Sequence, residues 1–173
     1  MDHLVLTVFA PDKAGQVEQI ALCIAEHGGN WLESRMSGLA GQFVGIVRVE
    51  APAQAHDELI LALQSLASQG IHIQVIPDGG EAPGQWKAIA MELVGNDRPG
   101  IVRDITRLLT EQGVNLEQLV TDVSPAPMSG DLLFHAEAIL AVPFEQTLEA
   151  LQSCLETLAD ELMVELVLRG EED

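Results

Sequence analysis

Basic residues are scarce in this sequence, and their scarcity sets the first limit on its function. The 173 residues include 8 Lys and Arg but 27 Asp and Glu, so the formal net charge is −19 at pH 7. A surface this negative repels the phosphate backbone that supplies most of the affinity of proteins for nucleic acids. We therefore expect no direct binding to DNA or RNA.

Aromatic residues are also few. They make up 3% of the chain, and tyrosine is absent. Proteins that bind single-stranded RNA on an open β-sheet stack its bases on aromatic side chains. The composition therefore argues against an RNA-recognition module.

Long apolar runs are missing. No run approaches the roughly 20 residues that a helix needs to cross a bilayer, and the N-terminus has neither the basic region nor the apolar core of a signal peptide. We expect no membrane contact and a cytoplasmic location.

Cysteine and histidine show no ligand pattern. Cys23 and Cys154 each fall in the middle of a helix-patterned segment, which predicts two buried thiols and no disulfide framework. The five histidines lack the i, i+4 spacing of metal sites, and the chain has no nucleophile elbow, phosphate-binding loop or dinucleotide motif. We expect no metal, no cofactor and no catalytic residue, and hence a protein that is not an enzyme.

What the sequence does contain is a repeat. Nearly half of the residues are apolar, enough for a packed core, and shifting the chain by 85 residues aligns two similar halves. The matched pairs are Asp12 with Asp97, Gly15 with Gly100, Val17 with Val102, Ile20 with Ile105, Gly28 with Gly113 and Asn30 with Asn115. Further on the shift becomes 91, as Phe43 meets Phe134, so the second copy carries an insertion, most simply at residues 124–131.

Proline and glycine divide the two copies. Residues 77–85, with the sequence PDGGEAPGQ, have no hydrophobic periodicity, which is typical of a linker. We expect an N-terminal domain over residues 1–76 and a C-terminal domain over residues 86–170.

Each copy reads as strand, helix, two strands, helix and strand. In the first, a buried strand over residues 3–9 precedes a helical stripe from Val17 to Ile24, and strands follow over residues 30–39 and 42–50, with Gly38 and Gly41 in the turn. Leu59, Leu63 and Leu66 mark a second helix, and residues 71–76 form the last strand. The second copy repeats this order.

The order βαββαβ predicts an α+β fold: two ferredoxin-like units in tandem, each a four-stranded antiparallel sheet with both helices on one face. The other face of each sheet must then be covered. A partner sheet or subunit is the better candidate, and the free sheet edges also favour self-association.

The junction between the first strand and the first helix combines a turn, a helix start and a glycine. Asp12 and Asp97 are placed to cap the helix or to meet a ligand's ammonium group, while Gly15 and Gly100 allow close approach to the backbone. The first turn of a helix presents free amides and the positive end of the dipole, which favour a carboxylate. Asn30 and Asn115 follow the helix, where asparagine serves either a turn or a ligand.

The motifs NDRPGIVRDI and EQGVN in the second copy resemble those of ACT domains, small regulatory modules that bind amino acids. This resemblance implies ligand-binding roles for the turn from Asp97, Arg98 and Pro99 to Gly100 and Ile101, and for Asn115. The first copy has Lys13 and Ala14 in place of the Arg-Pro pair, so Asp12, Gly15 and Asn30 form its weaker counterpart.

Two such units without a catalytic or DNA-binding domain resemble the glycine cleavage system transcriptional repressor family. That resemblance implies glycine as the effector, a DNA-binding transcriptional activator as the partner, and a homo-oligomer. Two alternatives stay open: a separate ACT regulatory subunit of a metabolic enzyme, and a structural oligomerisation module without a ligand.

Overall fold

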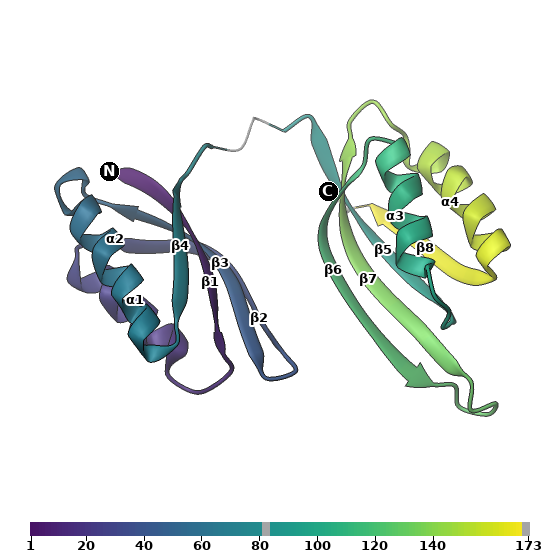
Figure 1. Cartoon of the computed structure of the whole chain (residues 1–173). Coiled ribbons are helices and arrows are strands. Elements are labelled where there is room, and N and C mark those ends of the chain that lie inside the picture. The colour runs from purple at the N-terminus through teal and green to yellow at the C-terminus, as the bar shows by residue number, and fades with distance from the viewer. Residues whose placement is uncertain (81–83, 171–173) are drawn as a thin grey trace. The chain divides into compact units, whose positions relative to one another are not determined.

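The computed structural model describes residues 1–80 and 84–170, and it divides into two compact units, Met1–Gly80 and Glu81–Asp173 (Figure 1). Residues 81–83 of the expected linker lie outside the described residues.

The first unit has the predicted order of elements. Two short 3-10 turns, Ala53–Ala55 and Leu66–Gln69, flank its second helix. The elements are β1 (Asp2–Pro11), α1 (Gln16–Glu26), β2 (Asn30–Leu39), β3 (Gln42–Ala51), α2 (His56–Ser65) and β4 (His72–Pro77).

The second unit repeats this order with a longer hairpin. Its elements are β5 (Trp86–Asn96), α3 (Ile101–Glu111), β6 (Asn115–Pro125), β7 (Leu132–Pro143), α4 (Leu148–Leu162) and β8 (Val164–Gly170). The insertion expected at residues 124–131 lies at the tip of the β6–β7 hairpin. Among the described helices, none is long and apolar enough to cross a membrane.

Both units form four-stranded antiparallel sheets, as predicted. The strand orders are β2-β3-β1-β4 and β6-β7-β5-β8, and every adjacent pair is antiparallel. Figure 1 shows α1 and α2 on one side of the first sheet, and α3 and α4 on one side of the second. The predicted α+β fold is confirmed.

Buried and more exposed side chains alternate along the central strands, which gives each sheet one buried face. In β1, buried side chains occur at every second residue, and in β5 the same period holds. These residues pack against helical stripes, so each unit has its own core. In the first unit that core contains Leu4, Leu6, Val8, Ile20, Ile24, Val47, Val49, Leu59, Leu63 and Ile71, and in the second Ile89, Leu93, Ile105, Leu109, Phe134, Leu140, Leu151 and Leu155.

The opposite face of each sheet has no helix over it and still carries apolar side chains. In the first unit this open face contains exposed Phe9, Val44, Ile46 and Ile76, and in the second it contains Val120 and Val167. Phe9 stacks on His72, with ring centroids 4.8 Å apart. These exposed side chains are where a covering partner would make contact, and that such a partner exists stays a prediction.

The β2–β3 turn differs from the prediction in one residue. Gly38 lies within β2 and pairs with Phe43, while Ala40 and Gly41 form the turn with positive φ angles of 50° and 80°. A two-residue hairpin turn of this type needs positive φ at both positions. Gly38 instead makes room for Asp12, since an added Cβ would lie 2.7 Å from the Asp12 Oδ2 atom.

The expected capping role of Asp12 and Asp97 is wrong. The N-cap positions of α1 and α3 belong to Gly15 and Gly100, three residues later, and no side chain caps either helix in the described part of the chain. Both glycines are left-handed, with φ angles of 92° and 91°. Each aspartate instead follows the last residue of a strand, β1 or β5, and its backbone amide bonds to the neighbouring hairpin. The Asp12 amide donates to the Gly41 carbonyl at 3.0 Å, and the Asp97 amide donates to the Leu132 carbonyl at 2.8 Å.

The core of the first unit can be tested with two leucines of α2. Leu63 is fully buried, whereas Leu61 is 67% exposed. We expect Leu63→Ala to lower the free energy of unfolding of this unit by about 2–5 kcal/mol, because it leaves a cavity, and Leu61→Ala to change it by less than about 0.5 kcal/mol. Urea unfolding followed by Trp31 fluorescence in a Trp86→Phe background reports on this unit, since Trp31 packs on its core. Equal effects of the two substitutions would contradict the assigned packing.

The left-handed turn before α1 gives a second prediction. Gly15→Ala meets no atom within 4 Å, so its only cost is the positive φ, about 1–2 kcal/mol. Gly79 also has free space for a Cβ but no positive φ, so Gly79→Ala should be neutral or stabilising by up to about 1 kcal/mol. The same Trp31 unfolding curves measure both values, and a neutral Gly15→Ala would refute the turn geometry.

Candidate ligand site

The turn between β5 and α3 presents backbone amides without intrahelical partners. The first helical hydrogen bond of α3 runs from the Asp104 amide to the Gly100 carbonyl, at 3.0 Å. The amides of Gly100 and Ile101 precede that bond, and no described side chain caps them. They point to the end of the helix where the dipole favours an anion, so the turn can accept a carboxylate.

The residues around this turn are divided between solvent and core. Asp97 is exposed, and Arg98 turns toward the helix, where its Nη2 atom lies 3.8 Å from the Asp104 carboxylate. Pro99 precedes Gly100 in the turn, and the Ile101 side chain is buried in the core. The Ile101 side chain therefore cannot reach a ligand, and this residue can contribute to a site only through its backbone.

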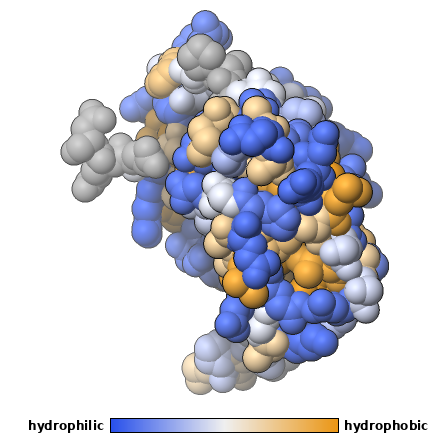
Figure 2. Space-filling model, turned by 90° about the vertical axis from the view of Figure 1, so that its left-hand side faces the viewer, coloured by the Kyte–Doolittle hydropathy of each residue, from blue (hydrophilic) through white to orange (hydrophobic). Residues whose placement is uncertain are grey.

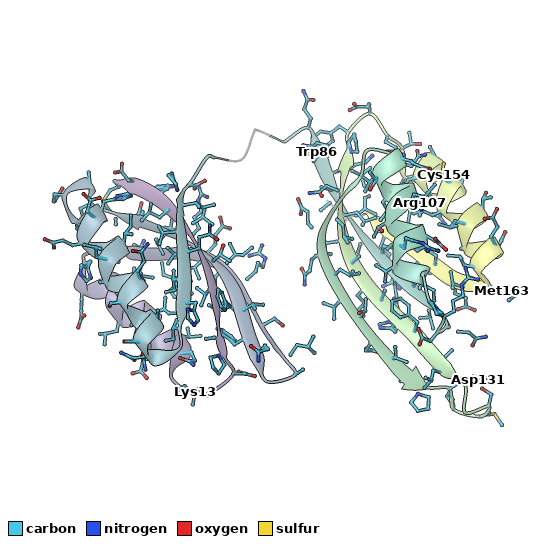
Figure 3. The ribbon with its side chains drawn as sticks, in the orientation of Figure 1. Lys13, Trp86, Arg107, Asp131, Cys154 and Met163 are labelled. Atoms are coloured by element: carbon cyan, nitrogen blue, oxygen red, sulfur yellow. The ribbon has the colours of Figure 1, made fainter. Side chains whose placement is uncertain are left out.

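The first copy has the same backbone but different side chains. Gln16 occupies the position of Ile101, is equally buried, and its Nε2 atom donates to the Pro11 carbonyl at 3.0 Å. This bond ties the turn to the end of β1. Lys13 is exposed at the tip of the same turn (Figure 3).

Asn30 and Asn115 lie far from these turns within their own units. Each begins a strand, β2 or β6, rather than forming the preceding turn. Asn115 pairs with Ala141 of β7, whereas Asn96, beside the Asp97 turn, pairs with Leu133, 141 − 133 = 8 positions away. Eight strand residues span about 26 Å. The first unit repeats this, since Asn30 pairs with Glu50 and Pro11 with Gln42.

The sequence-predicted site is therefore split within one unit. Figure 3 shows the two ends: Trp86 stands at the end of the sheet to which Asn115 belongs, and Asp131 at the hairpin end, near the Asp97 turn. The structure brings together Asp97, Arg98, Pro99, Gly100 and Ile101, and separately Asp12 and Gly15, but neither asparagine joins its turn. The Asn30 amide group instead lies 3.4 Å from the Glu50 carboxylate.

An ionic network occupies the open face of the first sheet. The Arg48 guanidinium donates to the Asp78 and Glu33 carboxylates and lies 3.4 Å from His3 Nδ1. The Gly80 amide, which donates to Asp78, and the Arg48 guanidinium hold the pKa of the Asp78 carboxyl below its ordinary value. The positive charge of Arg48 thus balances the carboxylates of Asp78 and Glu33.

The open face of the second sheet carries a cluster that the sequence did not predict. Glu92, His135 and Glu137 offer ligand atoms that all lie within 4.8 Å of one another, the only such group among the described residues. The cluster combines an i, i+2 pair on β7 with one residue of β5. Only the His-Ala-Glu alternation at residues 135–137 hints at it in the sequence, since the strand register is not visible there.

Both cysteines are free thiols, and Cys23 is buried as predicted, while Cys154 is half-buried. Burial, with a smaller effect of the Glu26 charge, raises the pKa of the Cys23 thiol. A protonated thiol is a poor nucleophile, so Cys23 serves packing.

Hydrophilic residues cover most of the face shown in Figure 2, with hydrophobic residues gathered in places between them. This mixture agrees with the high share of exposed acidic residues and with scattered exposed apolar side chains on the helices, such as Leu22 and Leu61. Scattered apolar residues of this kind are normal for a protein surface.

Comparison with known proteins assigns the two units. Models of the ACT domain match residues 2–75 and residues 90–156, one in each unit. No curated protein matches the chain.

Two crystal structures share the fold of both units, each covering 99% of this chain. An unknown protein from Galdieria sulphuraria is 27% identical, with 99% of each chain covered and a TM-score of 0.88. A second structure, named "putative glycine cleavage system transcriptional repressor", is 16% identical, covering 99% of this chain and 98% of the other with a TM-score of 0.73, and so shares the fold. With both units matched by its models, the chain belongs to the ACT domain family.

Proposed function

We propose that this protein is an amino-acid-responsive regulator that represses transcription of glycine cleavage genes by contact with a DNA-binding activator. The observation that carries the proposal is the pair of ACT units that together account for nearly all of the chain. The protein named as a glycine cleavage repressor has the same fold over 98% of its length, which supports this choice among ACT proteins.

The charge supports an indirect mode of action. With a formal net charge of −19, the chain repels DNA but attracts a basic surface, such as one beside the DNA-binding region of an activator. A repressor of this kind acts by occupying the activator rather than the promoter.

The effector in this proposal is a small amino acid, with glycine as the first candidate. Its carboxylate accepts from the amides of Gly100 and Ile101 at the start of α3, and the exposed Asp97 carboxylate balances its ammonium group. The Arg103 guanidinium enters the space that the absent Gly100 side chain leaves, its Nη2 atom lying 2.8 Å from where a Cβ would stand, so it can add a positive charge beside the ligand's carboxylate. The first copy, with Gln16 bound to Pro11, is the weaker site.

Asn115 enters this site from a second copy of the chain. β6 is an edge strand, and nearly all of its residues are exposed. If two copies of β6 pair antiparallel about a two-fold axis, the start of one strand meets the end of the other. Asn115 of one copy then lies on the side of the partner's Asp97 turn, which resolves the separation of about 26 Å within one unit.

Apolar side chains beside this edge favour such pairing. Val102 of α3 and Leu119 and Val123 of β6 are exposed on or next to the edge, and Ile105 lines a small apolar groove between the two elements. An uncovered edge strand flanked by apolar residues is a template for association.

The regulatory role can be tested by electrophoretic mobility shift with the promoter DNA of glycine cleavage genes at physiological salt. We expect no shift with this protein alone, and a glycine-dependent change in the shift produced by the activator. Specific binding of this protein alone to the promoter would refute the indirect mode. Association with a metabolic enzyme whose rate it changes, without any effect on the activator, would support the alternative of a separate regulatory subunit.

The ligand site can be tested with matched asparagine variants. Asn115→Ala should weaken glycine binding roughly tenfold or more, because loss of a buried hydrogen bond to the ligand costs about 1–3 kcal/mol. Asn30→Ala is the control and should bind nearly as the parent does. Calorimetry measures both affinities, and circular dichroism checks that each variant is folded.

Two outcomes would count against this site. Equal affinity of Asn115→Ala and the parent would leave the Asp97 turn as a helix start only. A monomer in sedimentation at tens of micromolar, with glycine present, would remove the second copy that the site requires.

A further inference from the structure

Three potential metal ligands converge on the open face of the second sheet. Glu92 of β5 is directly opposite Glu137 of β7, and His135 precedes Glu137 by two residues, so all three side chains lie on the same face. The His135 Nε2 atom is 3.3 Å from a Glu92 oxygen and 4.0 Å from a Glu137 oxygen.

The charges of this cluster are not balanced by a fixed cation. Two glutamates directly opposite each other on one face of an antiparallel pair repel and destabilise the sheet. Asp122 of β6 is opposite His135 and adds a third carboxylate, 3.8 Å from the His135 Nδ1 atom. Three carboxylates thus surround a single imidazole.

In the first unit, by contrast, an arginine balances a similar group of carboxylates on the open face. There Arg48 stands among the carboxylates of Glu33 and Asp78, and its guanidinium bonds to both. Among the described residues, the ion pairs of Glu92, Asp122 and Glu137 all involve His135, and no Lys or Arg takes part. In the second cluster, therefore, no Lys or Arg is bonded to the carboxylates, although Arg169 lies in the same hollow.

We propose that Glu92, His135 and Glu137 bind a divalent transition-metal ion, with Zn²⁺ as the best fit. Zinc bonds of about 2.0–2.2 Å to nitrogen and oxygen place tetrahedral ligand atoms roughly 3.3–3.5 Å apart. The distances of 3.3 and 4.0 Å from the His135 Nε2 atom to the Glu92 and Glu137 oxygens need only small side-chain rotations to reach that spacing. An imidazole in the ligand set favours zinc over Mg²⁺ or Ca²⁺, which prefer oxygen ligands alone.

Asp122 has a supporting role in this site. A histidine that binds metal through Nε2 commonly donates its Nδ1 hydrogen to a carboxylate, which fixes the tautomer and the ring orientation. The Asp122 carboxylate lies 3.8 Å from His135 Nδ1. The glutamates lie near the other ring nitrogen, Nε2. The cluster thus has both ligands and an orienting group.

Three protein ligands leave one tetrahedral position open. Glu92 and Glu137 also line a hollow of about 260 Å³ on the open face, together with Arg169 and Gln118. Water, or an anionic group attracted by Arg169, could enter from this hollow and complete the coordination. This inference is independent of the amino-acid site, which lies at the helix start.

Calorimetry of the full chain with ZnCl₂, after removal of metals with a chelator, tests the site at pH 7.5. We expect one saturable zinc per chain, with MgCl₂ giving at least tenfold weaker binding. His135→Gln and Glu137→Gln should each weaken zinc binding tenfold or more. His3→Gln is the matched control, because His3 also stands beside two carboxylates but next to Arg48, and it should bind zinc as the parent does.

Two further readouts separate this site from the cysteines. Cobalt(II) bound here should give no thiolate charge-transfer band, and zinc should shift the imidazole nitrogen resonances of His135 while circular dichroism stays unchanged. Zinc binding that persists at parental strength in both His135→Gln and Glu137→Gln, a thiolate band with cobalt, or no saturable binding at all would each overturn the proposal.

Discussion

The register between β5 and β7 is the constraint on which most of the second unit depends. Eleven paired positions, from Trp86 with Pro143 to Asn96 with Leu133, decide which side chains enter the core and which face outward. A slip of either strand by one residue would turn all of its side chains to the other face, which would place Glu92 of β5 or Glu137 of β7 in the core. The same register sets Asn115 eight positions from the Asp97 turn, so core packing and both proposed sites share one cause.

The sequence predicted the fold well because the repeat and the hydrophobic periods are local signals. The apolar strand over residues 3–9 and the helix marked by Leu59 and Leu63 can be recognised without knowledge of distant partners, and β1 and α2 confirm both. It failed where three-dimensional pairing decides. The capping role of Asp12 and Asp97 was wrong because a left-handed glycine begins each helix, and the Glu92–His135–Glu137 cluster depends on a cross-strand register that no spacing rule reveals.

The two copies keep one backbone plan but have diverged in side chains at corresponding places. At the start of the first helix, Ile101 only fills the core, while Gln16 bonds to the Pro11 carbonyl and fixes its turn. On the open faces, the first unit contains a self-balanced arginine network and the second an uncompensated carboxylate group around His135.

The longer tip of the β6–β7 hairpin has a practical consequence. Met128 at that tip is 99% exposed, and the tip stands outside the paired positions, which end at Pro125 and Leu132. Exposed loop tips with few backbone contacts tolerate added chain. Residues 127–130 are therefore a suitable attachment point for a fluorophore, and because the Asp97 amide bonds to Leu132 at the same end of the sheet, such a label would respond to events at the Asp97 turn without entering the second unit's core.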